Sequence, residues 1–270
     1  MPESLTADAL LELLRRMAHD VRSPLASVIS TLDMLAEGVY EPLNAKQTRA
    51  NERARRASRR TLAILDDFIT YVKADAGQID VKEQAFDPRS ALSAWCGALE
   101  ETCRVKGVTL HVTTDYDVPK TLFGPAEIIV RAVQPVLWNA ATFTMRGSVS
   151  VESSWTRANG TWHITVRDTG PGIPAEHQPH LFEPFWQGDE RPQAVSMPSG
   201  APAVTSAGAG LGLAVADALT RLLNGWISLG KTGPTGSTFR LQFPFMIAQG
   251  DPVKENRSTM IVDGSVPRDA

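Results

Sequence analysis

A stripe of apolar residues near the start of the chain constrains the fold more than any other feature of the sequence. Its members step by three or four residues, the spacing that places side chains on one face of an α-helix. A break follows at 38–42, and a second stripe then runs from Ala54 to Val72 before Ala76-Gly77 ends the helix. The sequence therefore predicts two long antiparallel helices. The first stripe consists of Leu10, Leu14, Met17, Val21, Leu25, Val28, Leu32 and Leu35.

Two helices of this length cannot bury both stripes within one copy of the chain. A wide apolar seam would remain in water, and a symmetric partner can cover it. We therefore expect residues 1–77 to form a helical hairpin that pairs with a second one as a dimeric four-helix bundle, so that the protein is a homodimer.

The character of the sequence changes at Gln78, where segments typical of strands and helices begin to alternate. Asn159-Gly160 is typical of a hairpin turn. The pattern predicts an α/β sandwich, a mixed sheet with helices on one face, over residues 78–246. We expect 188–208 to be a mobile loop over the ligand site and the polar tail 247–270 to be disordered. The expected strands are 79–83, 108–113, 148–155, 161–168, 226–229 and 237–243, and the expected helices are 88–106, 126–143 and 211–223.

Composition excludes several classes of protein. The formal net charge of −3 argues against a strongly basic nucleic-acid-binding protein. The two cysteines, Cys96 and Cys103, indicate neither a disulfide framework nor a zinc site, so we expect buried thiols and a reducing compartment. No apolar run approaches the roughly 20 residues of a membrane span, and the chain does not open with a signal-peptide pattern. We expect a cytoplasmic protein without membrane insertion.

Two glycine-rich motifs indicate a ligand site. They are Asp168-Thr-Gly-Pro-Gly-Ile173 and Gly208-Ala-Gly-Leu-Gly-Leu213. Glycine lets the backbone approach a ligand closely and adopt positive φ angles. The second motif opens the helix expected at 211–223, whose free N–H groups suit phosphate, and the Asp168 carboxylate can accept a hydrogen bond from a base. Each motif alone is also typical of an ordinary turn.

His19 is the candidate nucleophile. It lies in Ala18-His19-Asp20-Val21-Arg22-Ser23-Pro24-Leu25 between two members of the first stripe, so its ring is expected to project from the flank of the bundle into water. The neighbouring carboxylate of Asp20 can hold the proton on one ring nitrogen. Pro24 removes a backbone donor and is expected to bend the helix. The competing interpretation is an ordinary surface histidine.

The segment from Ala18 to Leu25 resembles the phosphoacceptor box of sensor histidine kinases, and the family's other boxes follow in order. The resemblance extends from about residue 7 to 245 and implies a dimeric kinase core, a phosphoacceptor hairpin joined to an ATP-binding domain. The matching segments are Trp138-Asn139-Ala140 for the asparagine box, Asp168–Ile173 and Gly208–Leu213 for the glycine boxes, Leu181-Phe-Glu-Pro-Phe185 for the phenylalanine box and Gly236-Ser-Thr-Phe239 for the closing element.

The resemblance also implies roles for single residues. His19 would accept the γ-phosphoryl group of ATP with Asp20 as its acid–base partner, and phosphohistidine would pass it to an aspartate in the receiver domain of a response regulator. Asn139 would bind Mg²⁺, and Asp168 would bind the adenine amino group, with Thr238 nearby. The other implied nucleotide contacts are Gly170, Gly172, Ile173, Phe182, Phe185, Gly208, Gly210, Leu211, Gly212 and Leu213.

The chain departs from the family pattern beside the expected nucleotide. Pro135 stands in place of a second asparagine, Thr142 in place of a lysine and Pro125 in place of an acidic residue. Proline inside a helix costs about 3 kcal/mol or more. A catalytically weakened phosphotransfer or scaffold protein of the same fold is therefore one alternative. A protein-serine kinase of the anti-sigma type is a second alternative, but the hairpin with His19 argues against it. Ser23 keeps a hydroxyl where bifunctional members orient a water for dephosphorylation.

Arginines crowd the start of the second helix. They form a solvated helix face or a docking surface for an acidic partner such as a response regulator. DNA binding is disfavoured because no groove-reading motif accompanies them. These residues are Arg49, Arg53, Arg55, Arg56, Arg59 and Arg60.

Two remaining features need brief interpretation. His177, His180 and Glu183 have a spacing that suggests a metal site, but we favour histidines on a helix surface. Only about six residues precede the first helix. Either the sequence is therefore part of a longer protein, or a separate sensor protein supplies the signal.

Overall fold

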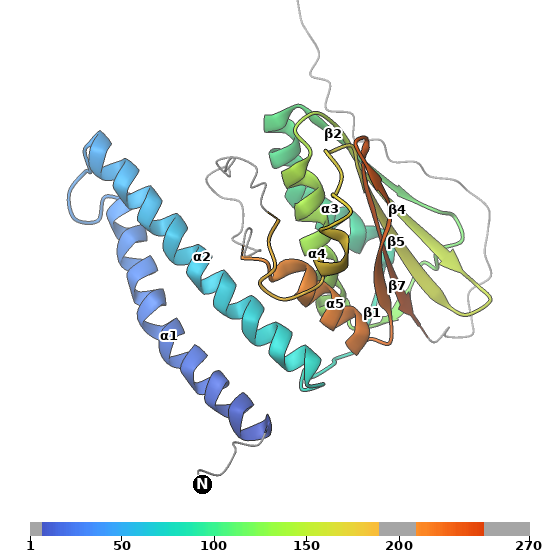
Figure 1. Ribbon diagram of the computed structural model, residues 1–270. Helices are drawn as coiled ribbons and strands as arrows, with labels where there is room; N and C mark the ends of the chain where they lie inside the picture. The colour runs from blue at the N-terminus through green and yellow to red at the C-terminus, as the bar shows by residue number, and fades with distance from the viewer. Residues whose placement is uncertain (1–6, 189–208, 246–270) are drawn as a thin grey trace, which may run out of the picture.

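The computed structural model describes residues 7–188 and 209–245 and places a helical hairpin beside an α/β sheet domain (Figure 1). The hairpin consists of α1 (Ala7–Ala36) and α2 (Ala45–Asp75). The expected order, a helical hairpin followed by an α/β domain, is confirmed. The domain limits at residues 77 and 246 stay predictions. The expectations for the loop up to 208 and for the tail 247–270 concern residues outside the described part.

The turn between the two helices is fixed by local hydrogen bonds. The Asn44 side chain accepts bonds from the N–H groups of Lys46 and Gln47, both at 3.0 Å, and Gln47 accepts one from the Asn44 N–H at 2.9 Å. This reciprocal capping box pairs N–H groups that helix starts otherwise leave free. At its other end α2 is capped by Ala76, and Gly77 follows with a φ of 66°. The expected break and helix end are both confirmed.

Asp33 of α1 ties the two helices together. It accepts hydrogen bonds from Arg55 at 2.6 Å and Arg59 at 2.9 Å. Burial alone would raise the pKa of Asp33, but the bonds from the two guanidinium groups outweigh it and lower the pKa. Two of the clustered arginines therefore hold the hairpin together, whereas Arg49 and Arg53 are exposed.

The apolar stripe of α1 is only partly covered in a single chain. Met17, Val21 and Val28 are 55%, 46% and 47% exposed, while Leu25 and Leu32 are half-buried. The helix runs through Pro24 without interruption. A continuous apolar strip therefore faces water along α1, as the spacing predicts.

The sheet domain contains a five-stranded mixed sheet in the order β2-β4-β5-β7-β6, in which only the β2–β4 pair is parallel. Helices cover one of its faces (Figure 1). A two-stranded sheet pairs β1 with β3. The elements are β1 (Gln84–Phe86), α3 (Pro88–Lys106), β2 (Val108–Thr114), β3 (Leu122–Gly124), α4 (Ala126–Phe143), β4 (Gly147–Thr156), β5 (Thr161–Asp168), the 3-10 turn η1 (Gln178–His180), α5 (Gly212–Leu222), β6 (Trp226–Gly233) and β7 (Gly236–Pro244).

One expected strand is wrong, and two short strands, β1 and β3, were missed. Residues 79–83 form no strand, and the chain first pairs at β1, where Ala85 lies opposite Phe123 of β3. Both strands have three residues, too few to show an alternating pattern. Their pairing also joins segments nearly forty residues apart, which local propensity does not encode.

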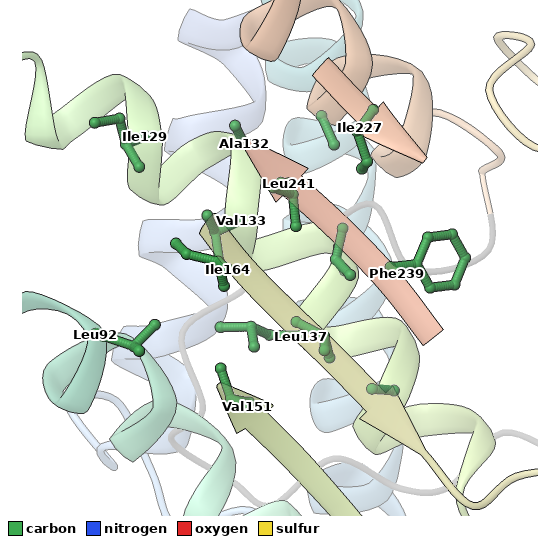
Figure 2. Packing of buried hydrophobic residues seen from close by; sticks show 14 of the residues in the cluster. Leu92, Ile129, Ala132, Val133, Leu137, Val151, Ile164, Ile227, Phe239 and Leu241 are labelled. Carbon is green, nitrogen blue, oxygen red and sulfur yellow. The ribbon is translucent and has the colours of Figure 1, made fainter. Parts of the chain in front are cut away.

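The core lies between the helices and the sheet. Leu92 of α3, Val133 and Leu137 of α4, Val151 of β4 and Ile164 of β5 are fully buried there (Figure 2). Trp162 is also fully buried and lies against an aromatic cluster at the end of the sheet; its ring contacts are Phe86, Trp95, Phe243 and Phe245.

Both cysteines lie in this core, as expected. Cys96 is 1% exposed and Cys103 is 2% exposed. Burial raises the pKa of the Cys96 thiol to about 12, so that the thiol stays protonated.

The second half of α2 packs against the sheet domain. The Phe68 and Phe185 rings lie 5.9 Å apart, and Ala74 is buried in the core of the sheet domain. Arg131 of α4 donates a hydrogen bond to the Thr70 hydroxyl. Helix α2 therefore contacts α1 on one side and the sheet domain on another (Figure 1).

Candidate functional site

His19 projects from α1 into water, as predicted. Its side chain and that of Asp20 are each 80% exposed, and its Nδ1 lies 3.4 Å from Asp20 Oδ1. In the tautomer that carries its proton on Nδ1, this proton faces the carboxylate and Nε2 keeps its lone pair. Ser23, one turn later on α1, is also exposed.

A groove of about 490 Å³ surrounds His19 between α1 and α2. Three cations of α1, Arg15, Arg16 and Arg22, line it together with Lys73 and Ile69 of α2. Arg15 and Arg16 are paired with Glu12, and Arg22 is paired with Asp66 of α2. The groove carries more positive than negative side chains, which suits an incoming phosphoryl group.

Asp168 closes β5 at the start of the first glycine motif and is 7% exposed. Its Oδ1 accepts hydrogen bonds from the N–H groups of Gly170 at 2.8 Å and Ser237 at 3.2 Å. Burial raises the pKa of this carboxyl, while the backbone bonds act in the opposite direction. Both bonds go to Oδ1, so Oδ2 is available to accept a hydrogen bond from a ligand. Thr238, also buried, follows Ser237 directly.

Gly172 makes the turn after Asp168 possible. It has a φ of +79°, and a Cβ at this position would lie 2.0 Å from the carbonyl oxygen of Gly233. The next residue, Ile173, donates its N–H to the Thr232 hydroxyl at 2.9 Å. The motif is thus pressed against the β6–β7 turn, and no larger side chain fits there.

The phenylalanine box and the second glycine motif are held together. The Phe185 N–H donates to the Gly210 carbonyl at 2.8 Å. Gly210 has a φ of +74°, and a Cβ on it would lie 2.3 Å from the Trp186 carbonyl oxygen. Phe185 itself adopts a φ of +65°, which is rare for an aromatic residue. Leu211 is fully buried and anchors the start of α5.

The remaining residues of these two boxes are placed as follows. Gly212 is the first residue of α5, and Phe182 and Leu213 pack partly buried against the core. Gly208 lies outside the described residues.

Helix α4 runs beside these motifs and carries Asn139. The Asn139 amide is half-buried and forms no hydrogen bond with any described residue. Pro135 is buried, and α4 continues through it. It lies opposite Gly212, where an added Cβ would be 3.3 Å from the Pro135 Cβ. Proline therefore replaces an expected polar group with an apolar contact between α4 and α5.

Lys106, at the end of α3, supports this helix and was missed in the sequence. Its Nζ donates to the carbonyl oxygens of Ala141 at 2.7 Å and Thr142 at 2.8 Å. These are last-turn carbonyls without a partner inside the helix. At the same end of α4, the Phe143 carbonyl oxygen would lie 3.1 Å from a Cβ on Gly170. Lys106 therefore fixes the end of α4 that abuts the first glycine motif.

His177 and His180 flank the ring of Trp186, with centroids 5.2 Å and 6.2 Å away. The His180 Nδ1 also lies 2.9 Å from Glu183 Oε1. Across residues 7–188 and 209–245, no three His, Cys, Asp or Glu side chains gather in a way that could hold a metal ion. The two histidines are therefore part of an aromatic cluster on the surface.

The structure thus brings the implied nucleotide residues together in two groups. In the first, Asp168 is bonded to Gly170 at the end of α4, Gly172 lies against Gly233, and Thr238 follows Ser237 on β7. In the second, Phe185 is bonded to Gly210, and Gly212 lies beside Pro135. His19 is on the separate hairpin.

Two family models match the chain. Residues 9–77 match the His Kinase A (phospho-acceptor) domain, and residues 124–247 match the Histidine kinase-, DNA gyrase B-, and HSP90-like ATPase. The first match contains His19, and the second contains both glycine motifs.

Relatives of similar sequence include a histidine kinase and a sensor protein. The hybrid signal transduction histidine kinase L of Dictyostelium discoideum is 30% identical over 230 residues, and the sensor protein TorS of Escherichia coli K12 is 30% identical over 257 residues. These matches cover 84% and 93% of this chain but 13% and 26% of the relatives. The chain therefore spans about a quarter or less of the relatives that it matches.

Solved structures with the same fold include full-length ShkA in complex with AMPPNP, which has a TM-score of 0.72 and 23% sequence identity. The match covers 88% of this chain and 46% of the ShkA chain. The histidine kinase AdeS of Acinetobacter baumannii has a TM-score of 0.56 and 19% identity, covering 84% of this chain and 98% of its own. At these identities the likeness shows the fold alone. None of the helices in the described parts of the chain has the length and apolar character to cross a bilayer.

Proposed function

This chain is homologous to the sensor histidine kinases and carries their phosphoacceptor and ATPase domains, and from that premise we propose that it phosphorylates its own His19 from Mg-ATP and passes the phosphoryl group to an aspartate of a response regulator. The observation that carries the proposal is that one chain holds both an exposed His19 beside Asp20 on the hairpin and a buried Asp168 at a glycine turn of the sheet domain.

The hairpin supplies the nucleophile. With its proton on Nδ1 beside Asp20, His19 attacks the γ-phosphorus through Nε2. A nitrogen–phosphorus bond forms, the bond from that phosphorus to the β–γ bridging oxygen breaks, and ADP leaves with the electron pair. Asp20 takes up the Nδ1 proton or passes it to water. Arg22 and Lys73 in the groove stabilise the charge on the phosphoryl oxygens.

The sheet domain binds the nucleotide. Asp168 Oδ2 accepts a hydrogen bond from the adenine amino group, since Oδ1 is already occupied by two backbone N–H groups. Gly170 and Gly172 let the chain pass close to the base, with Ile173 and Thr238 beside them, and the N-terminus of α5 lies toward the phosphates. The ATP analogue in the ShkA structure supports ATP as the donor.

Asn139 fits a role as a magnesium ligand. Its half-buried amide has no hydrogen-bond partner among the described residues, and an amide oxygen is a suitable ligand for a hard cation. A single protein ligand holds Mg²⁺ only together with phosphate oxygens, so the ion would arrive with the nucleotide and neutralise its charge.

The alternative, a catalytically weakened protein of the same fold, is not favoured. Pro135 leaves α4 continuous and Asn139 in place on it. The turn with Asp168 and the contact between Phe185 and Gly210 are both intact.

The partners follow from the same site. We propose a homodimer, because the exposed strip with Met17, Val21 and Val28 needs a covering surface, and the receiver domain of a response regulator as the acceptor. None of the described helices could span a membrane. We propose a cytoplasmic location because ATP is the phosphoryl donor. The signal would reach the hairpin from a sensor segment or from a separate sensor protein. In the same proposal Ser23, exposed one turn after His19, orients a water for hydrolysis of the phosphorylated response regulator, which releases inorganic phosphate.

The proposal is tested by incubating the protein with Mg-ATP labelled at the γ-phosphate. We expect protein-bound label that is stable to alkali and labile to acid, present in the parent and absent from His19→Gln. His177→Gln, a histidine outside the site, serves as control and should be labelled normally. A parent protein that takes up no label under any condition would overturn the kinase assignment.

A further inference from the structure

Arg131 is the only cation on α4, the helix that carries Asn139. It is exposed and, within the described parts of the chain, forms no ion pair. Its recorded contact is one hydrogen bond, from Nη2 to the Thr70 hydroxyl of α2. A guanidinium has five N–H donors, so this arrangement leaves most of its donor capacity for another ligand.

Arg131 lies on the same side of α4 as Pro135, four residues before it. Pro135 is one turn later on the helix, about 6 Å along its axis, and Asn139 is two turns later, about 12 Å along. Pro135 in turn lies against Gly212, the first residue of α5. Arg131 is therefore one turn from the point where the second glycine motif meets α4.

The same side chain lies close to the phosphoacceptor helices. Thr70, its partner, is flanked on α2 by Ile69, which lines the groove around His19. The Thr70 hydroxyl donates to the Asp66 carbonyl oxygen at 2.7 Å, and the Asp66 carboxylate pairs with Arg22, three residues after His19. Arg131 thus occupies the seam between the nucleotide helix and the hairpin.

The phosphate site otherwise lacks positive charge on these helices. Along α4, the positions around Asn139 are uncharged, including Pro135 and Thr142, and the first turn of α5 carries no basic residue. A triphosphate bound there needs a cation near its outer phosphate, because charge on the transferring oxygens must be neutralised.

We propose that Arg131 is the γ-phosphate ligand of this site: it leaves the Thr70 hydroxyl when ATP binds and engages the outer phosphate with its free N–H donors. This inference rests on the proposed nucleotide site. A planar guanidinium suits phosphate because it donates two parallel hydrogen bonds. The consequence is discrimination between ATP and ADP, which differ in that phosphate.

The test compares the affinities for Mg-ATP and Mg-ADP by titration calorimetry in four variants. Arg131→Gln should weaken ATP binding roughly tenfold or more and change ADP binding less than about twofold, because a hydrogen bond to a charged group is lost only with ATP. Arg131→Lys should retain part of the difference. Thr70→Val removes the present partner but keeps the arginine, and should leave ATP binding unchanged or tighter. Arg157→Gln, an arginine on the β4–β5 turn, is the control.

The outcomes separate the two proposals. Equal losses for ATP and ADP in Arg131→Gln, or the same loss in Thr70→Val, would show that Arg131 only docks α4 on α2 and would overturn the inference. A parent protein that binds neither nucleotide would overturn the proposed function itself.

Discussion

Pro135 of α4 lies opposite Gly212 of α5 so closely that a Cβ on Gly212 would be 3.3 Å from the Pro135 Cβ. The contact joins the helix with Asn139 to the start of the second glycine motif. It also shows how the chain accommodates a proline at a position where sensor histidine kinases carry an asparagine. An apolar contact between two helices replaces the amide side chain. The surrounding geometry supports four predictions about binding and assembly.

Gly172→Ala should weaken nucleotide binding and the fold together. The left-handed φ costs about 1 kcal/mol or more for a residue with a Cβ, and the added atom would meet the Gly233 carbonyl oxygen at 2.0 Å. Denaturant unfolding and nucleotide titration measure the two effects. Gly233→Ala, where an added Cβ meets nothing within 4 Å, is the control and should be nearly silent. Equal behaviour of the two variants would contradict the proposed role of this turn.

Asp168→Asn should abolish most nucleotide binding yet reduce the pH dependence of stability. Burial raises the pKa of Asp168 above its ordinary value of 3.8. A carboxyl with a raised pKa contributes stability below the unfolded pKa and loses it as pH rises through the folded value. The free energy of unfolding of the parent, relative to Asp168→Asn, should therefore fall as the pH rises above about 4, the ordinary pKa of the group. A relative stability that rises with pH would show that the backbone hydrogen bonds, and not burial, control this group.

Lys106→Met should destabilise the end of α4. It removes two hydrogen bonds to the carbonyls of Ala141 and Thr142 and leaves them unpaired, a cost of about 1–3 kcal/mol. Nucleotide affinity should fall as well, since this end of α4 abuts Gly170. Chemical denaturation of Lys106→Met beside Lys120→Met, an exposed lysine, measures the first effect. Indistinguishable stabilities would refute the capping role.

Val21→Glu should break the homodimer. Val21 is 46% exposed in the single chain and lies in the strip that we propose to be covered by a second copy. A buried, unpaired carboxylate in each subunit should weaken association at least tenfold. Sedimentation velocity over a range of concentrations measures this. Val39→Glu, on the exposed hairpin turn, should leave the dimer intact, and a parent that sediments as a monomer at every concentration would contradict the prediction.

Local sequence signals predicted much of the fold. The helix from Pro88 to Lys106 was predicted with its limits. Local residues mark both ends in the structure: Asp87 caps the start, a proline occupies the first position, and Gly107 ends the helix with a φ of 67°. The strand from Thr161 to Asp168 was predicted equally well, since a hairpin turn precedes it and the glycine motif follows.

The rest depends on contacts between distant segments. Strands β1 and β3 stabilise each other only as a pair. The bonds of Lys106 to α4 and of Arg131 to Thr70 join residues 35 and 61 positions apart, so no local pattern indicates them. Phe185 adopts a positive φ with no glycine or asparagine to signal it; the contact with Gly210 imposes that conformation.

The central claim is that the phosphoryl group is carried on His19, and that Asp20 at Nδ1 leaves Nε2 to react. Nuclear magnetic resonance of protein labelled with ¹⁵N at histidine, recorded after reaction with Mg-ATP, tests it most directly. We predict a phosphorus–nitrogen coupling at Nε2 of one histidine, lost in His19→Gln. A coupling at Nδ1, or one that survives in His19→Gln, would contradict the account.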